Sequence, residues 1–160
     1  MTLETRIARL EAIEAIQQLK HRYFRACDTK QLDLMRACFV DGSMHIDYGA
    51  VGTFTHRDEL VALFEKVGCH PHMVEMHHGQ NPEITVVNEH SAIGIWGLFY
   101  YLINTQDNTL TQLGGFYRDE YRREGEQWRI SSTVFKVHSM QVHKLVDGHV
   151  ASIMAGSPPA

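Results

Sequence analysis

Apolar residues recur at intervals of three and four along the first part of the chain. They stand at Ile7, Leu10, Ile13, Ile16, Leu19, Tyr23 and Cys27. Because this spacing places side chains on one face of an α-helix, the pattern predicts a long amphipathic helix from about Leu3 to Cys27.

Two shorter helices are predicted after the first. One spans Leu32 to Phe39, and Asp28 and Gln31 precede it with the spacing of a capping box. The other lies between His56 and Val67. The sequence therefore places its helices mainly in the first half of the chain.

After Gly68 the pattern changes to alternating apolar and polar residues rich in β-branched side chains. Including one earlier segment, the predicted strands are MHIDY at Met44, HMVEMHHG leading into EITVV at Glu83, and the segments from Ser91, Thr109 and Gln127. Short polar connections favour an antiparallel meander, and Gly94, Gly97, Gly114 and Gly115 would permit bulges and bending.

These patterns predict an α+β fold: N-terminal helices packed on a strongly curved, mainly antiparallel sheet, forming a cone with an internal pocket. At 160 residues the chain has the length of one domain. We assign residues 1–155 to that domain and expect the tail GSPPA, 156–160, to be disordered.

Composition narrows the functional classes. The formal charge of −4 and the absence of Lys and Arg clusters argue against nucleic acid, and no apolar run is long enough for a membrane span or signal peptide. We therefore expect a cytoplasmic protein that binds a small molecule. The three cysteines lack CxxC spacing, which argues against a disulfide framework or a zinc knuckle.

The segment GCHPHMVEMHHG, from Gly68 to Gly79, concentrates four histidines. His70 and His72 form an HxH pair that could bind metal on a strand, although the remaining ligands would lack a known zinc spacing, and an exposed loop is the other interpretation. His77 and His78 are adjacent, so on a strand only one of them can face a pocket. Asp28 either caps the following helix or accepts a hydrogen bond from such a histidine.

Aromatic residues could line the pocket or simply fill the core; they are Tyr23, Phe24, Phe39, Trp96, Phe99, Tyr100, Phe116 and Phe135. Lys136, His138 and His143 could supply a cation or belong to a solvated strand edge. Asp47 and Tyr48 follow a short strand, either at the pocket rim or in a turn.

Three segments together resemble the SnoaL-like branch of the nuclear-transport-factor-2-like, or cystatin-like, superfamily. They are EAIQQLKHRYFRACDTKQLD, EMHHGQNPEITV and GGFYRDEYRREGEQWRI. Within that branch the chain is most similar to the bile acid 7α-dehydratases, and more distantly to the hexachlorocyclohexane dehydrochlorinases and scytalone dehydratases.

The resemblance implies a catalytic set of Tyr23, Asp28 and His77. The dehydratase's second tyrosine aligns with Asp47, one residue before Tyr48, and its basic residue on the last strand aligns near Val137, beside Lys136. We expect Phe24, Tyr48, Trp96, Phe99, Phe116, Phe135 and Lys136 to contact substrate.

The resulting hypothesis is a lyase that needs neither a metal nor a cofactor. It would eliminate water from a cyclic apolar molecule such as a steroid, terpenoid or polyketide-like compound. The alternatives are an isomerase or cyclase using the same pocket, and a non-catalytic ligand-binding or assembly module. By resemblance we also expect a homo-oligomer, a dimer or a trimer.

Overall fold

The structure, a computed structural model, describes residues 1–156. Its helices are α1 (Leu3–Asp28), α2 (Leu32–Ala37) and α3 (Arg57–Gly68), with a short 3-10 turn at Gly49–Val51. The predicted long first helix and the third helix are confirmed, and α2 ends two residues before the predicted Phe39.

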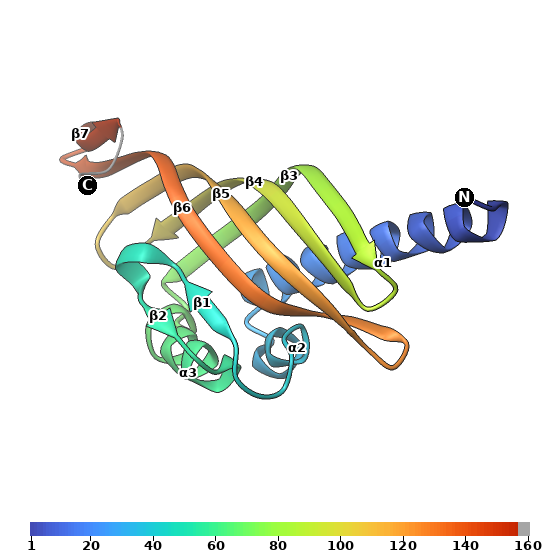
Figure 1. The fold of residues 1–160 in the computed structure, drawn as a ribbon. Helices are drawn as coiled ribbons and strands as arrows, with labels where there is room; N and C mark the ends of the chain where they lie inside the picture. Colours follow the sequence, from blue (N-terminus) through green and yellow to red (C-terminus); the bar gives the residue numbers. More distant parts are fainter. Residues whose placement is uncertain (157–160) are drawn as a thin grey trace.

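The first turns of α1 do not touch the core. They project beyond the sheet (Figure 1), and Ile7 and Leu10 are 46% and 66% exposed. Burial along the apolar stripe becomes complete only at Ile16. The stripe is therefore longer than the surface on which the helix packs.

The strands form one seven-stranded sheet in which β6 pairs with β1, β5 and β7. Its order is β2-β1-β6-β5-β4-β3, with β7 paired to β6 alone, and only the β1–β6 pairing is parallel. The bounds are β1 His45–Asp47, β2 Thr53–Phe54, β3 Met73–Asn88, β4 Ser91–Asn104, β5 Thr109–Glu124, β6 Gln127–Val146 and β7 His149–Gly156. The antiparallel meander predicted from the short connections is thus confirmed for β3 to β6.

The register shifts lie at only some of the predicted positions. One falls between Gly114 and Gly115, as expected, whereas Gly94 keeps a continuous register with both neighbouring strands and Gly97 does so only with β5. Near Gly97 the shift is on the partner strand, between Gln80 and Glu83. A bulge needs one extra residue in one strand, and β3 supplies it.

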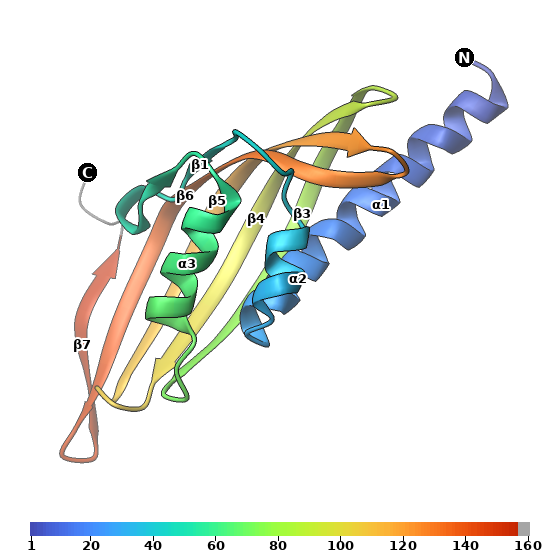
Figure 2. The same ribbon diagram turned by 90° about the horizontal axis from the view of Figure 1, so that it is seen from below.

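The sheet curves around the helices. Figure 2 shows α1, α2 and α3 on one side of it, with the opposite face uncovered by any helix of residues 1–156. Strands β6 and β7 continue past the helices as a hairpin that the sequence did not predict. Gly156, placed in the tail by the sequence, ends β7 opposite Met140; residues 157–160 of that tail lie outside the described residues.

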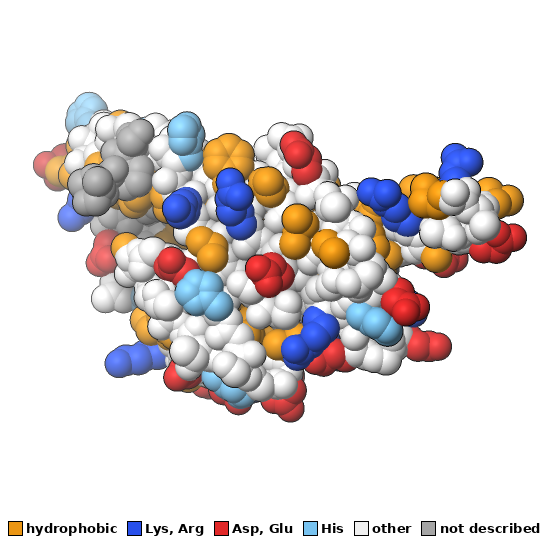
Figure 3. Space-filling model, in the orientation of Figure 1, with side chains coloured by type: hydrophobic (Ala, Val, Ile, Leu, Met, Phe, Trp, Pro, Cys, Tyr) orange, Lys and Arg blue, Asp and Glu red, His pale blue; other side chains and the backbone are white. Residues whose placement is uncertain are grey.

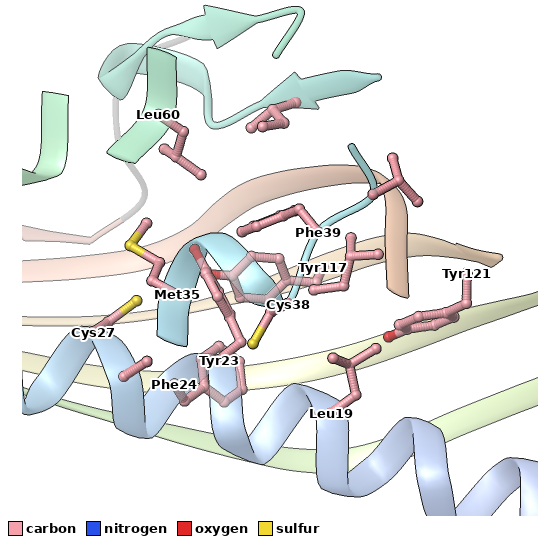
Figure 4. Close-up of a cluster of buried hydrophobic side chains, with 14 of the residues drawn as sticks. Leu19, Tyr23, Phe24, Cys27, Met35, Cys38, Phe39, Leu60, Tyr117 and Tyr121 are labelled. Carbon is pink, nitrogen blue, oxygen red and sulfur yellow. The ribbon is translucent and has the colours of Figure 1, made fainter. Parts of the chain in front are cut away.

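The core lies between α1, α2 and the concave face of the sheet. Figure 4 shows side chains of α1 and α2 meeting there, with Leu60 of α3 above them. Cys27, Met35 and Leu60 point toward a common space that the core does not fill. No helix within residues 1–156 is long and apolar enough to cross a membrane.

Candidate active site

A cavity of about 290 Å³ lies between the concave face of the sheet and the helices. This is near the lower end of the range for small-molecule pockets, about 300–1,000 Å³. Its lining is mostly apolar: Tyr23, Cys27, Met35, Tyr48, Val51, Leu60, Leu63, Phe64, Val67, Gly68, Met73, Glu75, His77, Leu98, Tyr100, Leu113, Tyr117 and Phe135. Polar groups are few, so each one is informative.

Asp28 and His77 are joined by three contacts. The His77 backbone N–H donates to both Asp28 oxygens, at 3.1 and 3.2 Å, and His77 Nδ1 lies 2.6 Å from Asp28 Oδ1. A carboxylate only accepts, so His77 Nδ1 is the donor, and in the neutral ring Nε2 is then the nitrogen with the lone pair. Both side chains are nearly buried, 12% exposed for His77 and 10% for Asp28.

This contact also settles the role of Asp28 in the fold. The N-cap of α2 is Gln31 and makes no side-chain capping bond, so the predicted capping box is absent. A carboxylate at the last residue of α1 opposes the helix dipole. The N–H groups of His77 provide the compensating interactions.

Packing fixes the His77 ring on both sides. Phe24 stacks on it with ring centres 5.5 Å apart, and the Tyr100 ring lies 4.7 Å away. Gly79 is necessary for this arrangement, since a Cβ there would lie 2.5 Å from the Phe24 ring. His78 is exposed, as strand alternation predicts for the neighbour of an inward-facing residue.

A pair of tyrosines supplies hydroxyl groups to the same cavity. The hydroxyls of Tyr23, on α1, and Tyr48, just after β1, are 2.9 Å apart. Burial raises the pKa of both phenols, so both stay protonated. One hydroxyl donates to the other, which leaves one O–H free to donate to a ligand. Tyr48, one residue after the position that the resemblance aligns with a tyrosine, therefore brings its hydroxyl into the cavity.

Strand alternation moves several predicted substrate contacts away from the cavity. Phe135 lines it, but Phe99 and Phe116 lie on the outer face of the sheet, 40% and 53% exposed. Lys136 is exposed and pairs with Phe116 on that outer face. The bulge at Gly114 and Gly115 falls beyond Lys136 along β6, so it does not turn this side chain inward.

Two other predicted contacts are core residues. Phe24 is 3% exposed and lies behind His77, and Trp96 is fully buried and donates to the Tyr121 hydroxyl. Neither lines the cavity. The sequence shows that both residues are large aromatics, but it does not show whether core residues already cover their rings.

Glu75 is a polar cavity residue that sequence reasoning missed, as is Tyr117. Glu75 is the charged one. Its carboxylate accepts hydrogen bonds from Tyr100 and from Lys30, which forms an ion pair with it. A signal was present, because Glu75 stands two residues before His77 and residues at that spacing on a strand share a face. The sequence contains no such signal for Lys30, because this residue lies in the turn after α1 and only its side chain reaches β3.

The histidines of the segment Gly68 to Gly79 do not converge. The rings of His70 and His72 stack at 5.2 Å, and His70 Nε2 lies 2.8 Å from the Lys66 carbonyl oxygen. His77 faces the cavity while His78 is exposed on the strand. Within the part of the chain that the structure describes, no three His, Cys, Asp or Glu side chains are grouped to hold a metal ion.

Comparison with known proteins identifies the family. Residues 8–134 match the sequence profile of the SnoaL-like domain. The chain belongs to the SnoaL-like family. The more specific similarity to bile acid 7α-dehydratases stays a prediction.

Solved structures share the fold of this SnoaL-like domain. A putative scytalone dehydratase from Novosphingobium aromaticivorans superposes with a TM-score of 0.77 at 21% identity, covering 94% of this chain and 95% of its own. A type 2 hexachlorocyclohexane dehydrochlorinase, LinA, gives 0.73 at 18% identity, with 96% and 97% covered. A Nostoc punctiforme protein of unknown function with a cystatin-like fold gives 0.61 at 19%, with 77% and 88% covered. The predicted α+β, cystatin-like architecture is thereby confirmed.

Proposed function

We propose that this SnoaL-like domain is a cofactor-independent lyase that eliminates water from a compact, cyclic, largely apolar molecule. The observation that carries the proposal is the Asp28–His77 pair, in which Nδ1 contacts the carboxylate and the ring lines an apolar cavity. The structural neighbours named as a dehydratase and a dehydrochlorinase support the reaction class.

His77 acts as the general base. Its Nε2 removes a proton from the carbon next to a carbonyl group, and Asp28 stabilises the imidazolium that forms. The free O–H of the Tyr23–Tyr48 pair donates to the carbonyl oxygen, where negative charge develops. General acid–base catalysis of this kind contributes about 10² to 10⁴-fold in rate.

The second half of the reaction returns the enzyme to its starting state. The electron pair left on carbon forms the new C=C bond as the C–O bond at the next carbon breaks. The departing oxygen takes the proton from His77 Nε2 and leaves as water. No electrons are gained or lost by the protein, so the step needs no redox partner.

The proposal is tested by turnover on a panel of β-hydroxy ketones built on steroid and polyketide-like rings. We expect His77→Ala to lose about 10²-fold or more. Asp28→Asn should have a comparable effect, because an amide N–H can donate to Nδ1 and so shift the ring proton to Nε2. His78→Ala is the matched control and should turn over normally. Elimination that survives both changes at the dyad would contradict the assignment.

Isomerisation is a second candidate that the same geometry favours. A base beside a hydroxyl pair that holds a carbonyl oxygen can return the proton to another carbon instead of to a leaving group. Reaction in D₂O distinguishes the two. An isomerase gives a product with the composition of the substrate, heavier only by the deuterium that it takes up, whereas the lyase product has lost one water.

A non-catalytic binding module is less well supported. Such a module has no need for an aspartate and a histidine 2.6 Å apart beside a cavity. Ligand binding without any turnover across the panel would favour it.

We also infer that the domain binds a second copy of itself through the outer face of the sheet. Phe99, Phe116, Ile93 and Ile103 on that face are each 40% exposed or more. Figure 3 shows hydrophobic side chains on this face over β4 to β6, interspersed with charged ones. Exposed apolar patches of this kind commonly mark interfaces.

A further inference from the structure

We propose that Glu75 and Tyr100 form an acceptor subsite in the cavity that selects ligands carrying a hydroxyl group away from the reacting carbonyl. The inference rests on the proposed function in that the cavity takes up an apolar ring compound. It adds a specificity determinant, contributed by β3 and β4, that the proposed chemistry does not use.

The first argument is the cost of placing a carboxylate here. Glu75 is 9% exposed and lines a cavity whose walls are otherwise mainly apolar. Burying a charge is unfavourable unless it is paired and hydrogen-bonded. Lys30, which does not itself line the cavity, neutralises Glu75, and its ammonium group lies 4.9 Å from the centre of the Phe64 ring.

The second argument is the direction of the hydrogen bonds. Tyr100 donates its hydroxyl proton to Glu75 Oε2 at 2.7 Å, and Lys30 donates to Oε1. Burial, followed by the charge of Glu75, raises the pKa of Tyr100, so the phenol keeps that proton. Each carboxylate oxygen retains acceptor capacity, and the Tyr100 oxygen has no proton left to donate. Glu75 and Tyr100 can therefore accept hydrogen bonds from a ligand and donate none.

The third argument is the contrast with the tyrosine pair. Tyr23 and Tyr48 offer a free O–H, so their part of the cavity suits a carbonyl oxygen. Tyr48 follows β1, and in the sheet β1 is separated from the strands of Glu75 and Tyr100 by β5 and β6. A ligand with a carbonyl at one end and a hydroxyl at the other would satisfy both ends and would present its ring to His77 in one orientation.

Binding of three related naphthalenes tests the subsite without requiring turnover. They are 6-hydroxy-2-acetonaphthone, its 6-methoxy ether, which cannot donate, and 2-acetonaphthone, which lacks the second oxygen. We expect the native protein to bind the hydroxy compound at least about tenfold more tightly than the ether, as a hydrogen bond to a charged acceptor implies. Titration calorimetry gives each Kd.

Two variants test whether Glu75 and Tyr100 cause the preference for the hydroxy compound. Glu75→Gln and Tyr100→Phe should reduce the ratio of the two Kd values toward one. Glu83→Gln, the same change at an exposed position of β3, should keep it. Thermal unfolding of each variant checks that the fold is retained. A purely structural role for the Glu75–Lys30 ion pair would change the unfolding temperature without changing the ratio.

The outcomes separate this inference from the proposed function. Equal binding of the hydroxy compound and the ether overturns the subsite, as does a preference that survives both variants. If none of the three compounds binds, the cavity does not take up such rings and the subsite is rejected with it. His77→Ala should abolish turnover while keeping the binding preference, so each proposal can fail alone.

Discussion

Asp28 shows how a residue can be unfavourable for its own helix and still be held by a partner from a distant strand. A negative charge at the end of α1 opposes the helix dipole by roughly 0.3–1 kcal/mol. The hydrogen bonds from the backbone and ring of His77 offset this. The mismatch between Asp28 and its helix was visible in the sequence, but the partner lies 49 residues away and only the folded chain shows which histidine it is.

Alternation along one strand separated inward-facing from outward-facing residues. It did not show which residues of the neighbouring strands face inward. It placed His77 and His78 on opposite faces, which the structure confirms. Phe99 and Phe116 have the large aromatic side chains expected of a pocket wall, but the strand register turns both outward. The inward-facing residues of one strand indicate those of the next only when the register between the two strands is known. That register depends on bulges such as the one at Gly114.

Gly79 offers a test of how the His77 ring is held. In Gly79→Ala the new methyl group would lie 2.5 Å from the Phe24 ring, so Phe24 must move and lose its stacking on His77. We expect a loss of about 1–3 kcal/mol in unfolding free energy, measured in urea. Activity on any identified substrate should also fall. Gly97→Ala, where the nearest atom is 3.4 Å away, is the control and should unfold near the native value.

At the scale of elements, α1 is attached to the sheet by a buried ion pair. Lys20 Nζ lies 2.7 Å from Asp119 Oδ2 on β5, and both side chains are fully buried. Asp119 also accepts hydrogen bonds from Tyr121 and Thr133, so its charge is well compensated. Desolvation lowers the pKa of Lys20, which the attraction of Asp119 partly opposes.

Removing one member of this ion pair should strongly destabilise the fold. Lys20→Met leaves Asp119 buried without its counter-charge, and we expect a loss of about 3–5 kcal/mol in unfolding free energy. Adding Asp119→Asn removes the orphan charge and should recover part of that loss, as measured by denaturant unfolding. Lys66→Met, at an exposed position of α3, should change stability little. An additive double variant would show that the two side chains do not interact.

The elements themselves were largely predictable, because each carries its own periodicity over many residues. The long helix and the four meander strands are of this kind. The sequence missed β2, which has two residues, and β7, whose exposed pattern lacks the alternation of a half-buried strand. It also extended the apolar face of α1 to residues that project beyond the sheet, since periodicity does not reveal where a helix loses its partner.

At the scale of the whole molecule, the two faces of the sheet differ in what covers them and in the side chains that they carry. The concave face carries the cavity, whose polar groups are contributed by α1, the segment after β1, β3, β4 and β5. No helix of residues 1–156 covers the convex face, which carries exposed aromatic and aliphatic side chains (Figures 1 and 3). Phe99 and Phe116, which the sequence assigned to substrate contacts, lie on this convex face.

A charge introduced on the convex face should therefore weaken self-association. Phe116 is 53% exposed, and we expect Phe116→Glu to lower the mass observed by light scattering after size-exclusion chromatography, because a buried unpaired carboxylate opposes assembly. Val87→Glu, at a 60% exposed position near the β3–β4 turn, is the control and should keep the native mass. The cavity lies on the other side of the sheet, so Phe116→Glu should still bind ligands as the native protein does. A native protein that elutes as a monomer at micromolar concentration would contradict the inferred interface.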